Sequence, residues 1–459
     1  MLKQKMPILV ILLNSIKMTK IIVIKKKINS FNKEIEVSGD KSLSIRWVLL
    51  ASQAIGKSRA YNLLMSEDVL AAIEAIRKLG IKVRVHNDHC EIFGDGINGF
   101  KYKNGIIIDA KNSGTLGRLI LGLLIKSPNK IKIIGDKSLS KRDFSRVTVP
   151  LKKFGAKFNY KIKNKLPLTI LGSQTSKGIN YIENKGSAQC KSSVMLAALN
   201  SSGTTYIKAK KSRNHTELLF KYLKVPIKVK KTKKYDFIEI KKPKKICSFN
   251  YNIPGDISSS AFFMVLALLT KNSKLLIKNI NINPSRIGVI TILKKMGAKI
   301  SLKNKRNYKG EKISDILIQS SKNLRGINCP SELNTSAIDE FLIIFIAAAK
   351  AKGISYFKEI SELNQKESPR LNLGSKILNM MGVKTELTKN SIKIYGQPNL
   401  KITKQVIIKD YLKDHRIFMM STIAALTCGG QWKIHDKDSI NTSFPSFLKI
   451  VRSISNKSL

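Results

Sequence analysis

Short segments that combine Ser, Gly or Asp with Lys or Arg recur along this 459-residue chain, and they resemble the starts of helices. A helix start offers free backbone N–H groups and the positive end of the helix dipole, so it binds anions readily. The fork of an Arg side chain adds a good fit to phosphate and carboxylate groups. If the segments converge, they predict a strong polyanion site built from Lys41, Arg46, Arg142, Arg370 and Arg416. The segments read GDKSLSIR from Gly39, KNSGTLGR from Lys111, GDKSLSKR from Gly135, GSAQCK from Gly186 and DHRIF from Asp414.

Each residue of these segments also has an ordinary structural interpretation. Ser42 would be a helix N-cap, and Asp339 an N-cap or a first-turn carboxylate. Glu367 would be half of an exposed charge pair, Arg416 a surface arginine and Cys190 a buried, inert thiol. Recurrence at equivalent places of a repeated unit favours the functional interpretation.

The repeated unit that must position these segments is visible in the sequence. A helix that ends in Gly and is followed by a strand recurs as KLGIKV, KFGAKF, KMGAKI and MMGVKT, with a degenerate copy, YLKVPIKV. The Gly suits the left-handed position that ends a helix. Helices such as SSSAFFMVLALLT and AIDEFLIIFIAAAKAKG are apolar on most sides, so we expect them to be buried. Six units result, starting near residues 40, 110, 187, 255, 337 and 414.

Six units in a chain of this length predict two α/β domains of three units each, because one core rarely holds so many residues. We place the first domain at 38–252 and the second at 1–37 together with 253–459, with hinges near 38 and 253. Residues 1–17 are expected to be a disordered extension, or to precede a true start at Met18. Their apolar run, PILVILL, is too short to span a bilayer.

The formal net charge of +54 would ordinarily suggest nucleic acid or an anionic membrane as a partner. However, 70 of the 84 basic residues are Lys and they are spread along the chain, which favours solvated Lys on most helix faces. A nucleic-acid binder more often shows Arg with interleaved aromatic residues. The five scattered Cys residues indicate reduced thiols and a cytoplasmic protein. The five His residues show no metal-ligand pattern, so no metal site is predicted.

Taken in order, the motifs resemble the family of 5-enolpyruvylshikimate-3-phosphate (EPSP) synthases, from about Val37 to Phe447. SGDKSLSIR is similar to the opening motif of the family, KNSGT to its Gly-Asn-Ala-(Gly/Ala)-Thr loop, and GDKSLSKRD to its Gly-Asp-x-Ser-Leu-x-x-Arg-Pro motif. SAQCKS, SRNHTE, ELNQKESPR, DHRI and SFP follow in the family order. The resemblance implies a two-domain inside-out α/β barrel of six βαβαββ repeats, three per domain.

The resemblance also implies an activity. Enolpyruvyl would pass from phosphoenolpyruvate to the 5-hydroxyl of shikimate 3-phosphate with release of phosphate, in the shikimate pathway to chorismate and aromatic amino acids. It implies no metal or organic cofactor, a monomer, and glyphosate as an inhibitor. Gly114 stands where tolerant relatives place Ala, so we expect the chain to be sensitive.

The same resemblance assigns roles to single residues. Asp339 would accept the proton of the attacking hydroxyl, Glu367 would protonate the enol methylene carbon, and Lys41 would touch both substrates. Shikimate 3-phosphate would be held by Lys41, Ser42, Arg46, Ser187, Ala188, Gln189, Asp339 and Lys366. Phosphoenolpyruvate would be held by Lys41, Asn112, Gly114, Thr115, Arg142, Gln189, Arg370 and Arg416. Closure of the domains about their hinges would exclude water and strengthen these contacts.

Several positions depart from the family pattern without removing a catalytic residue, so the sequence predicts an active enzyme. Pro369 should restrict Ser368 and begin a helix. The other departures are Ser38, Lys111, Asp143, Asn214, Asn364 and Thr442. Three alternatives stay open: the sister transferase that acts on UDP-N-acetylglucosamine, a basic nucleic-acid-binding protein, and an inactive relative. The sister enzyme uses a loop Cys, and none lies between Cys90 and Cys190.

Overall fold

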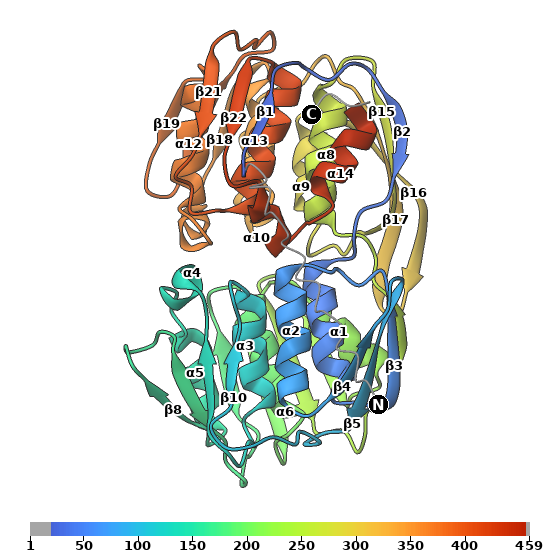
Figure 1. Ribbon diagram of the computed structural model, residues 1–459, viewed down its shortest axis with the longest axis vertical. Helices are drawn as coiled ribbons and strands as arrows, with labels where there is room; N and C mark the ends of the chain where they lie inside the picture. The colour runs from blue at the N-terminus through green and yellow to red at the C-terminus, as the bar shows by residue number, and fades with distance from the viewer. Residues whose placement is uncertain (1–19, 456–459) are drawn as a thin grey trace, which may run out of the picture.

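The computed structural model describes residues 20–455 and arranges them in two α/β domains stacked along the long axis of the molecule (Figure 1). The expectations for residues 1–17 and for a start at Met18 lie outside the described residues. Among the helices of residues 20–455, none is both long enough and apolar enough to cross a membrane.

Each domain consists of three units of the βαβαββ type, so the fold class predicted from the sequence is confirmed. Within residues 20–455, two units of the second domain have sheets of three strands, and the other units have sheets of four. In a complete unit the first strand runs parallel to the second. The fourth strand lies between the second and the third and is antiparallel to both, as in the sheet β10-β11-β13-β12. Figure 1 shows the helices towards the middle of each domain and the sheets on its flanks.

The first domain contains units one to three. Unit one has α1 (Lys41–Ala51), β3 (Ile55–Tyr61), α2 (Glu67–Lys78), β4 (Lys82–Val85), β5 (His89–Asp95) and the returning β14 (Asn250–Asn252). Unit two has β6 (Ile107–Asp109), α3 (Gly114–Leu123), β7 (Ile131–Ile134), α4 (Lys137–Ser140), α5 (Ser145–Lys153), β8 (Lys157–Tyr160) and β9 (Leu168–Leu171). Unit three has β10 (Asn180–Glu183), α6 (Ala188–Ala198), β11 (Thr204–Lys210), α7 (His215–Tyr222), β12 (Ile227–Lys231) and β13 (Tyr235–Lys241).

The second domain contains units four to six. Unit four has β2 (Asn32–Ile35), α8 (Ile257–Leu269), β15 (Lys274–Asn281), α9 (Gly288–Lys295), β16 (Lys299–Tyr308) and β17 (Glu311–Gln319). Unit five has a 3₁₀ turn (Ser331–Leu333), α10 (Asn334–Ala337), α11 (Phe341–Ala349), β18 (Gly353–Phe357), a second 3₁₀ turn (Ser361–Gln365), α12 (Arg370–Met380), β19 (Thr385–Leu387) and β20 (Ile392–Gly396). Unit six has β21 (Gln405–Ile408), α13 (His415–Cys428), β22 (Gln431–Ile434), a 3₁₀ turn (Lys437–Thr442), α14 (Phe447–Ser455) and the N-terminal β1 (Ile22–Ile24).

The N-terminal strands belong to the second domain, where they appear in blue among yellow to red elements (Figure 1). β1 pairs antiparallel with β22 and adds a third strand to the sheet of the last unit. β2 pairs parallel with β15 and opens unit four. The second domain is therefore assembled from both ends of the described chain.

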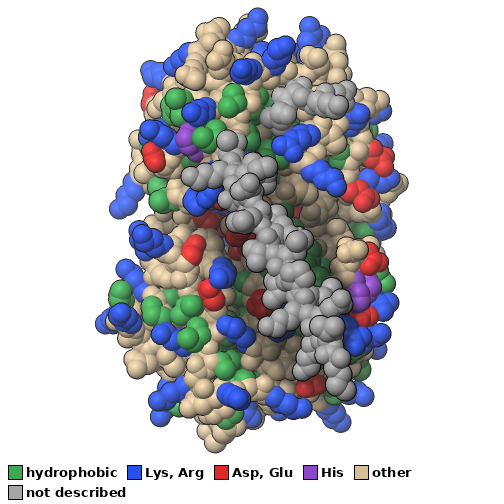
Figure 2. All heavy atoms as spheres, viewed as in Figure 1, with side chains coloured by type: hydrophobic (Ala, Val, Ile, Leu, Met, Phe, Trp, Pro, Cys, Tyr) green, Lys and Arg blue, Asp and Glu red, His purple; other side chains and the backbone are tan. Residues whose placement is uncertain are grey.

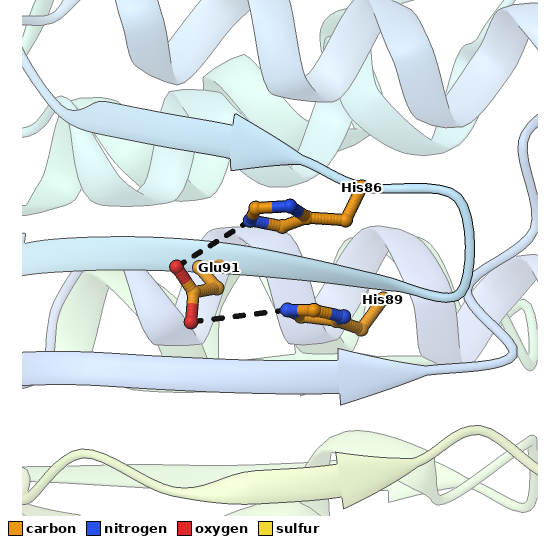
Figure 3. Close-up of side chains that lie close together, drawn as sticks. All are labelled: His86, His89 and Glu91. Carbon is orange, nitrogen blue, oxygen red and sulfur yellow. Dashed lines mark ion pairs between the residues drawn. The ribbon is translucent and has the colours of Figure 1, made fainter.

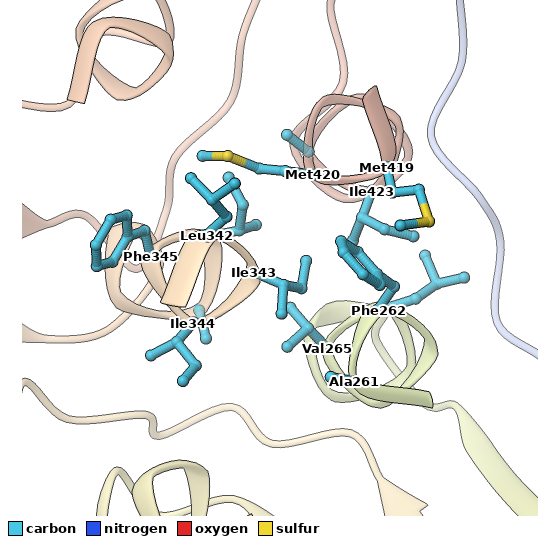
Figure 4. Packing of buried hydrophobic residues seen from close by; sticks show 14 of the residues in the cluster. Ala261, Phe262, Val265, Leu342, Ile343, Ile344, Phe345, Met419, Met420 and Ile423 are labelled. Atoms are coloured by element: carbon cyan, nitrogen blue, oxygen red, sulfur yellow. The ribbon is translucent and has the colours of Figure 1, made fainter. Parts of the chain in front are cut away.

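The apolar helices are buried, as predicted. Every residue of α11 and α13 is buried, and α8 is buried from Ile257 to Leu268. Figure 4 shows these three helices end on, with Val265 facing Ile343 and Phe262 lying beside Ile423. Full burial of such a side chain contributes about 1.5–3 kcal/mol, so the three helices form a firm base for the residues at their N-terminal ends.

The helix-ending glycines predicted from the repeat also adopt the expected conformation. Gly80, Gly155, Gly297 and Gly382 have φ between 84° and 97°. In the degenerate copy, Lys224 takes the same left-handed conformation with φ 56°. These positions turn each second helix back into the outer sheet.

The chain crosses between the two hydrophobic cores twice, and the crossings lie against each other. One core contains residues 43–253 and the other contains residues 24–37 and 257–454. The backbone N–H of Asp40 donates to Pro254 O at 2.8 Å, and that of Asp256 donates to Ser38 O at 3.1 Å. A Cβ on Gly39 would lie 2.2 Å from the carbonyl oxygen of Asn62, so only Gly fits there. The predicted hinge positions fall in these two paired segments.

Candidate active site

A cavity of about 1810 Å³ lies between the domains, and the N-terminal ends of their inner helices line it. Lys41 and Ser42 of α1, Thr115 of α3, Gln189 of α6 and Ser258 of α8 face it, as do His415 and Arg416 of α13. Basic side chains outnumber acidic ones along its wall. The cavity therefore combines helix N-termini with surplus positive charge, which favours polyanionic ligands.

Short polar side chains hold the helix starts in place. Asp40 accepts from Leu43 N at 2.9 Å, Asp256 from Ser258 N at 2.7 Å and Asp414 from Arg416 N at 2.9 Å. In α3 and α6 the caps are Ser113 and Ser187. The cap of α1 is Asp40, so the N-cap interpretation of Ser42 is wrong and leaves its side chain at the cavity.

The segments GDKSLSIR and GDKSLSKR form the same local turn. In α4, Asp136 accepts from Leu139 N at 2.7 Å, as Asp40 does from Leu43 N in α1. One turn opens an eleven-residue helix and the other a four-residue helix of a different unit.

Seven arginines line the cavity, namely Arg46, Arg118, Arg142, Arg213 of the segment SRNHTE, Arg286 of the segment NPSRIG, Arg370 and Arg416. Arg416 is 8% exposed, so it is not the surface arginine of the ordinary interpretation. Three of the seven received no role from sequence, Arg118, Arg213 and Arg286. Their signal was present, since each lies in a segment of the same Ser/Gly/Asn composition.

Lys41 and Arg46 form one corner of the cavity. Lys41 Nζ lies 2.9 Å from Oδ2 of Asp68, and its backbone N–H donates to Oδ2 of Asp256 at 3.3 Å. Arg46 donates to Thr216 Oγ1 at 2.8 Å and to Ser192 Oγ at 3.1 Å. Burial lowers the pKa of Arg46 to about 10, so it stays charged at neutral pH. Arg46 is thus held by two hydroxyl groups, whereas the ammonium group of Lys41 is paired with a carboxylate.

A second corner comes from α3, α5 and α6. Gln189 accepts from Arg118 at 2.7 Å and donates to Thr115 Oγ1 at 3.1 Å. Asn112 Oδ1 accepts from Arg142 Nη2 at 3.2 Å. Among the described residues, the buried Nε of Arg142 has no hydrogen-bond partner, so this donor is available to a bound anion.

Gly114 is the one predicted site residue that does not line the cavity. It begins α3 behind the two guanidinium groups of this corner. A Cβ on Gly114 would lie 2.9 Å from Nη1 of Arg118 and 3.0 Å from Nη1 of Arg142. The absence of a side chain at this position therefore leaves room for the two arginines.

Asp339 lies between α10 and α11, surrounded by cations of both domains. Its carboxylate is 2.6 Å from Arg213 Nη2 of the first domain, 3.3 Å from Lys366 Nζ and 3.7 Å from Arg370 Nη1. Arg416 donates to its carbonyl oxygen at 2.7 Å. Burial alone would raise the pKa of Asp339, but these cations outweigh it and hold the pKa well below its ordinary value. The N-cap of α11 is Glu340, so the N-cap interpretation of Asp339 is wrong.

Glu367 lies just before α12 and faces the first domain. Its carboxylate is 2.5 Å from Arg370 Nη2 and 3.9 Å from Arg142 Nη2, and its carbonyl oxygen accepts from Ser138 Oγ. Burial would raise the pKa of Glu367, but Arg370 and Arg142 hold it well below its ordinary value. Arg370 is fixed in turn by two hydrogen bonds to Asp414. Glu367 therefore does not form the exposed charge pair of its ordinary interpretation. It contacts Arg142 of the other domain instead.

His415 begins α13 at the same cavity. Burial lowers its pKa to about 3 despite the neighbouring Asp414, so the imidazole is neutral. Within residues 20–455 its Nε2 has no hydrogen-bond partner, and sequence reasoning gave it no role. Cys190 is buried as expected, and burial raises the pKa of its thiol.

The departures from the family pattern have local partners. Pro369 is the N-cap of α12, which begins one residue later than predicted. Asn364 Oδ1 accepts from Leu371 N at 3.0 Å and Asn372 N at 3.3 Å and so caps this helix from a distance. Asp143 caps the start of α5 through Ser145 N, and Asn214 bridges to Asn283 of the other domain.

Comparison with known proteins agrees with this geometry. A family model described as EPSP synthase (3-phosphoshikimate 1-carboxyvinyltransferase) matches residues 25–451. The 3-phosphoshikimate 1-carboxyvinyltransferase of Ruthia magnifica subsp. Calyptogena magnifica is 41% identical over 438 residues, 95% of this chain and 98% of that one. The enzyme of the same name from Bacillus subtilis (strain 168) is 34% identical over 436 residues, 95% and 100% of the two chains.

Solved structures agree as well. EPSP synthase from Acinetobacter baumannii matches with a TM-score of 0.83 and 34% identity over 94% of this chain and 98% of that one. The enolpyruvyl transferase NikO from Streptomyces tendae shares the fold, with a TM-score of 0.74 at 12% identity over 95% and 97% of the chains. Lys and Arg are scattered over the face shown in Figure 2, without the single basic element that a nucleic-acid binder would present. The ordered helix-start motifs, the cavity that they line and these similarities lead to one conclusion, that the chain belongs to the EPSP synthase family.

Proposed function

We propose that this chain transfers the enolpyruvyl group of phosphoenolpyruvate to the 5-hydroxyl of shikimate 3-phosphate and releases phosphate. One observation carries the proposal for the residues: Asp339 and Glu367 lie in the same interdomain cavity, each paired with Arg370 and each facing a cation of the first domain. Both substrates carry phosphate and carboxylate groups, so the surplus cations of the cavity match their charge.

The reaction moves protons at the methylene carbon of phosphoenolpyruvate and at the 5-hydroxyl, and we assign one carboxylate to each. Glu367 donates a proton to the methylene carbon of phosphoenolpyruvate, which makes C2 electrophilic. The 5-hydroxyl oxygen forms a bond to C2 while Asp339 accepts the hydroxyl proton. The C2–O bond to phosphate then breaks, and the leaving phosphate takes up the proton held by Asp339. The methyl carbon returns its proton to Glu367 to give the enol ether. No net proton or electron is left over.

Both carboxylates have a low pKa in the free protein, and substrate binding should raise it. Arg213, Lys366 and Arg370 stabilise the anionic forms as long as no other anion is present. Phosphate and carboxylate groups of the substrates would recruit the same cations. The pKa of each carboxylate then rises towards the range in which it can exchange a proton.

The remaining predicted residues have positions that suit binding. We assign Lys41, Ser42, Arg46, Ser187, Ala188, Gln189 and Lys366 to shikimate 3-phosphate, and Lys41, Asn112, Thr115, Arg142, Gln189, Arg370 and Arg416 to phosphoenolpyruvate. All of them line the cavity. We assign Gly114 the indirect role of leaving space for Arg118 and Arg142.

Phosphate release from the two substrates tests the activity. Asp339→Asn and Glu367→Gln should each lower kcat by about 10²–10⁴-fold, the usual contribution of a positioned acid or base. Glu362→Gln is the matched control, because Glu362 is a half-exposed carboxylate of the same cavity that pairs with Arg146 at 3.5 Å. Folded parent protein that releases no phosphate, or releases it only with UDP-N-acetylglucosamine, would overturn the proposed reaction. Full activity of either variant would overturn only the role of that residue.

We further propose that the two domains close about hinges near 38 and 253. The paired crossings at Gly39 and Gly255 support this, because they are the only places where residues 20–455 pass between the two cores. Small-angle X-ray scattering should show a smaller radius of gyration with both shikimate 3-phosphate and glyphosate than without ligand. An unchanged radius at saturating ligand contradicts closure.

Glyphosate is proposed as an inhibitor that competes with phosphoenolpyruvate. Gly114→Ala should weaken inhibition, because its Cβ would displace the guanidinium groups of Arg118 and Arg142. An inhibition constant far above the KM for phosphoenolpyruvate in the parent protein would refute the expected sensitivity.

Oligomeric state and compartment are also proposals. We expect a cytoplasmic monomer, with the free thiols of all five cysteines in support of the compartment. Light scattering after gel filtration should give the 51.4 kDa mass of one chain, and twice that mass would refute the monomer.

A further inference from the structure

A cluster of two histidines and one glutamate lies on the outer sheet of unit one, away from the cavity. His86 follows β4, His89 begins β5 and Glu91 lies two residues further along β5. The backbone N–H of His86 donates to His89 O at 2.8 Å, which closes a tight hairpin around Asn87 and Asp88. Figure 3 shows the three side chains grouped on the same face of this hairpin. None of the three lines the interdomain cavity.

The distances within this cluster are those of ligands on one metal ion and not those of hydrogen bonds. His86 Nε2 lies 3.6 Å from Glu91 Oε2, and His89 Nε2 lies 3.8 Å from Glu91 Oε1. Both exceed the usual length of a hydrogen bond. Zinc bonds of about 2.0–2.2 Å in a tetrahedral site place neighbouring ligand atoms roughly 3.4 Å apart. All three ligand atoms lie within 4.8 Å of one another, so small side-chain rotations would complete the site.

The histidine rings are held in a suitable orientation. They stack with centroids 4.3 Å apart and planes 15° apart, so both Nε2 atoms face the same carboxylate. His89 Nδ1 is 2.7 Å from Asp88 Oδ1, a contact that fixes the proton on Nδ1. The lone pair of neutral His89 Nε2 then faces the oxygen of Glu91. Such a carboxylate–histidine pair is the usual outer support of a metal ligand.

Two cations of β3 compete for the glutamate. Arg59 Nη2 donates to Glu91 Oε1 at 2.7 Å, and Lys57 Nζ lies 3.6 Å from the same oxygen. Oε2 faces His86 instead. Oε1 of Glu91 is therefore engaged with Arg59 on one side and lies near His89 on the other, whereas Oε2 is turned to His86. The basic side chains weaken the attraction of the cluster for a metal ion but do not occupy the oxygen that would bind it.

We propose that His86, His89 and Glu91 form a binding site for a divalent metal ion of the zinc class, which prefers imidazole and carboxylate ligands. The exposed side of the site leaves room for water as the fourth ligand, since the side chain of His86 is 43% exposed. The bound ion fastens the β4–β5 turn to the sheet. Linear spacing did not reveal this site, because the hairpin brings the two histidines together and only the pleat of β5 turns Glu91 to the same face.

Zinc chloride titrated calorimetrically into full-length, tag-free protein tests this site. We expect saturable binding of one equivalent. His86→Gln and His89→Gln should each weaken the affinity at least tenfold, and Arg59→Gln should strengthen it because Glu91 is released. His435→Gln is the control, since His435 lies in the second domain and outside the cluster. Circular dichroism checks the fold of each variant.

Histidine NMR of the parent protein gives a test that needs no variant. Addition of zinc should shift the ring signals of two of the five histidines, assigned through the same substitutions. Binding of equal affinity in the double variant His86→Gln/His89→Gln would overturn the site. Absence of saturable binding in the parent would also overturn it and leave an ion-pair cluster of Glu91 with Arg59.

Discussion

Arg286 connects the two domains at the wall of the cavity, and its replacement should cost a large part of the stability of the protein. Its guanidinium is 3.0 Å from Asp40 Oδ2 of the first domain and 3.3 Å from Asp256 Oδ1 of the second. These two carboxylates cap α1 and α8, the helices that begin at the cavity. The guanidinium also lies 3.4 Å from His215 Nε2, whose Nδ1 contacts Glu311 at 2.6 Å.

The expected size of the effect follows from burial. The side chain of Arg286 is 3% exposed, that of Asp40 0% and that of Asp256 10%. Arg286→Met keeps the length of the side chain but leaves the charge of Asp40 buried without its partner. Breaking a buried pair in this way costs about 3–5 kcal/mol. We expect the lower end of that range, because Asp256 lies close enough to the surface to gain some hydration.

The loss of unfolding free energy in Arg286→Met should depend on pH. Burial would raise the pKa of Asp40, but Arg286 holds it below its ordinary value in the parent. The contribution of Asp40 is therefore complete above its unfolded pKa of about 3.9 and is lost only as the pH falls through the lower folded value. In Arg286→Met the opposing charge is gone, so burial raises the pKa of Asp40 and mild acid neutralises it. The difference in the free energy of unfolding between the parent and Arg286→Met should therefore shrink between pH 7.5 and pH 5. The contribution of Asp40 to the stability of the parent should change little over this range.

Urea unfolding can be followed separately in each domain, because each holds one of the two tryptophans. Trp47 lies in α1 and Trp432 in β22. Trp432→Phe leaves a signal from the first domain and Trp47→Phe one from the second. Arg306→Met in exposed β16 is the control and should stay within about 0.5 kcal/mol of the parent. An Arg286→Met deficit below about 1 kcal/mol, or one equal at both pH values, would refute this account of the buried pair.

Three further outcomes are expected. Gly39→Ala should destabilise the protein by about 1–3 kcal/mol in thermal unfolding, because its Cβ meets backbone at 2.2 Å, while Gly117→Ala, with an ordinary 3.4 Å contact to Phe144, should not. Asn364→Ala should cost about 0.5–2 kcal/mol by uncapping α12 and should raise the KM for phosphoenolpyruvate through Arg370, whereas Asn364→Asp keeps the acceptor and should retain both. Binding of both substrates should take up protons, measured by calorimetry in buffers of different ionisation enthalpy. The uptake should fall in Glu367→Gln, and equal uptake in that variant would contradict the proposed change in its pKa.

Local patterns were enough to predict the parts of the fold that depend on neighbours in sequence. Helix ends at Gly80, Gly155, Gly297 and Gly382 follow from the conformation of one residue. The burial of α11 follows from a run of apolar side chains without a polar face. Capping by Asp40 is equally local, and the choice of Ser42 in its place failed because two acceptable caps stood two residues apart.

Contacts between distant segments were beyond such patterns. Nothing in the sequence around Ile22 indicates that β1 pairs with β22, more than 400 residues away, because strand pairing leaves only a short apolar run as a trace. The partners of Arg286 come from both domains, and the signal for Arg286 itself was only its place in a helix-start segment. The resemblance assigned Gly114 to phosphoenolpyruvate through its motif, and only the structure shows that two arginines occupy the space beside it.

The arrangement of charge in the cavity explains why a transferase of two polyanions needs so many buried carboxylates. Cations without partners would repel one another. Removing them from water would also cost free energy, so both effects would keep the domains apart. Asp339 pairs with Arg213 across the cleft, and Glu367 faces Arg142 across it, so each carboxylate stands in for a substrate anion in the free protein. A substrate that displaces these carboxylates from their cations replaces one set of charge pairs by another. In the mechanism that we propose, the carboxylates that are released are also the groups that move protons. Binding and acid–base activation are in this way two consequences of the same exchange of partners.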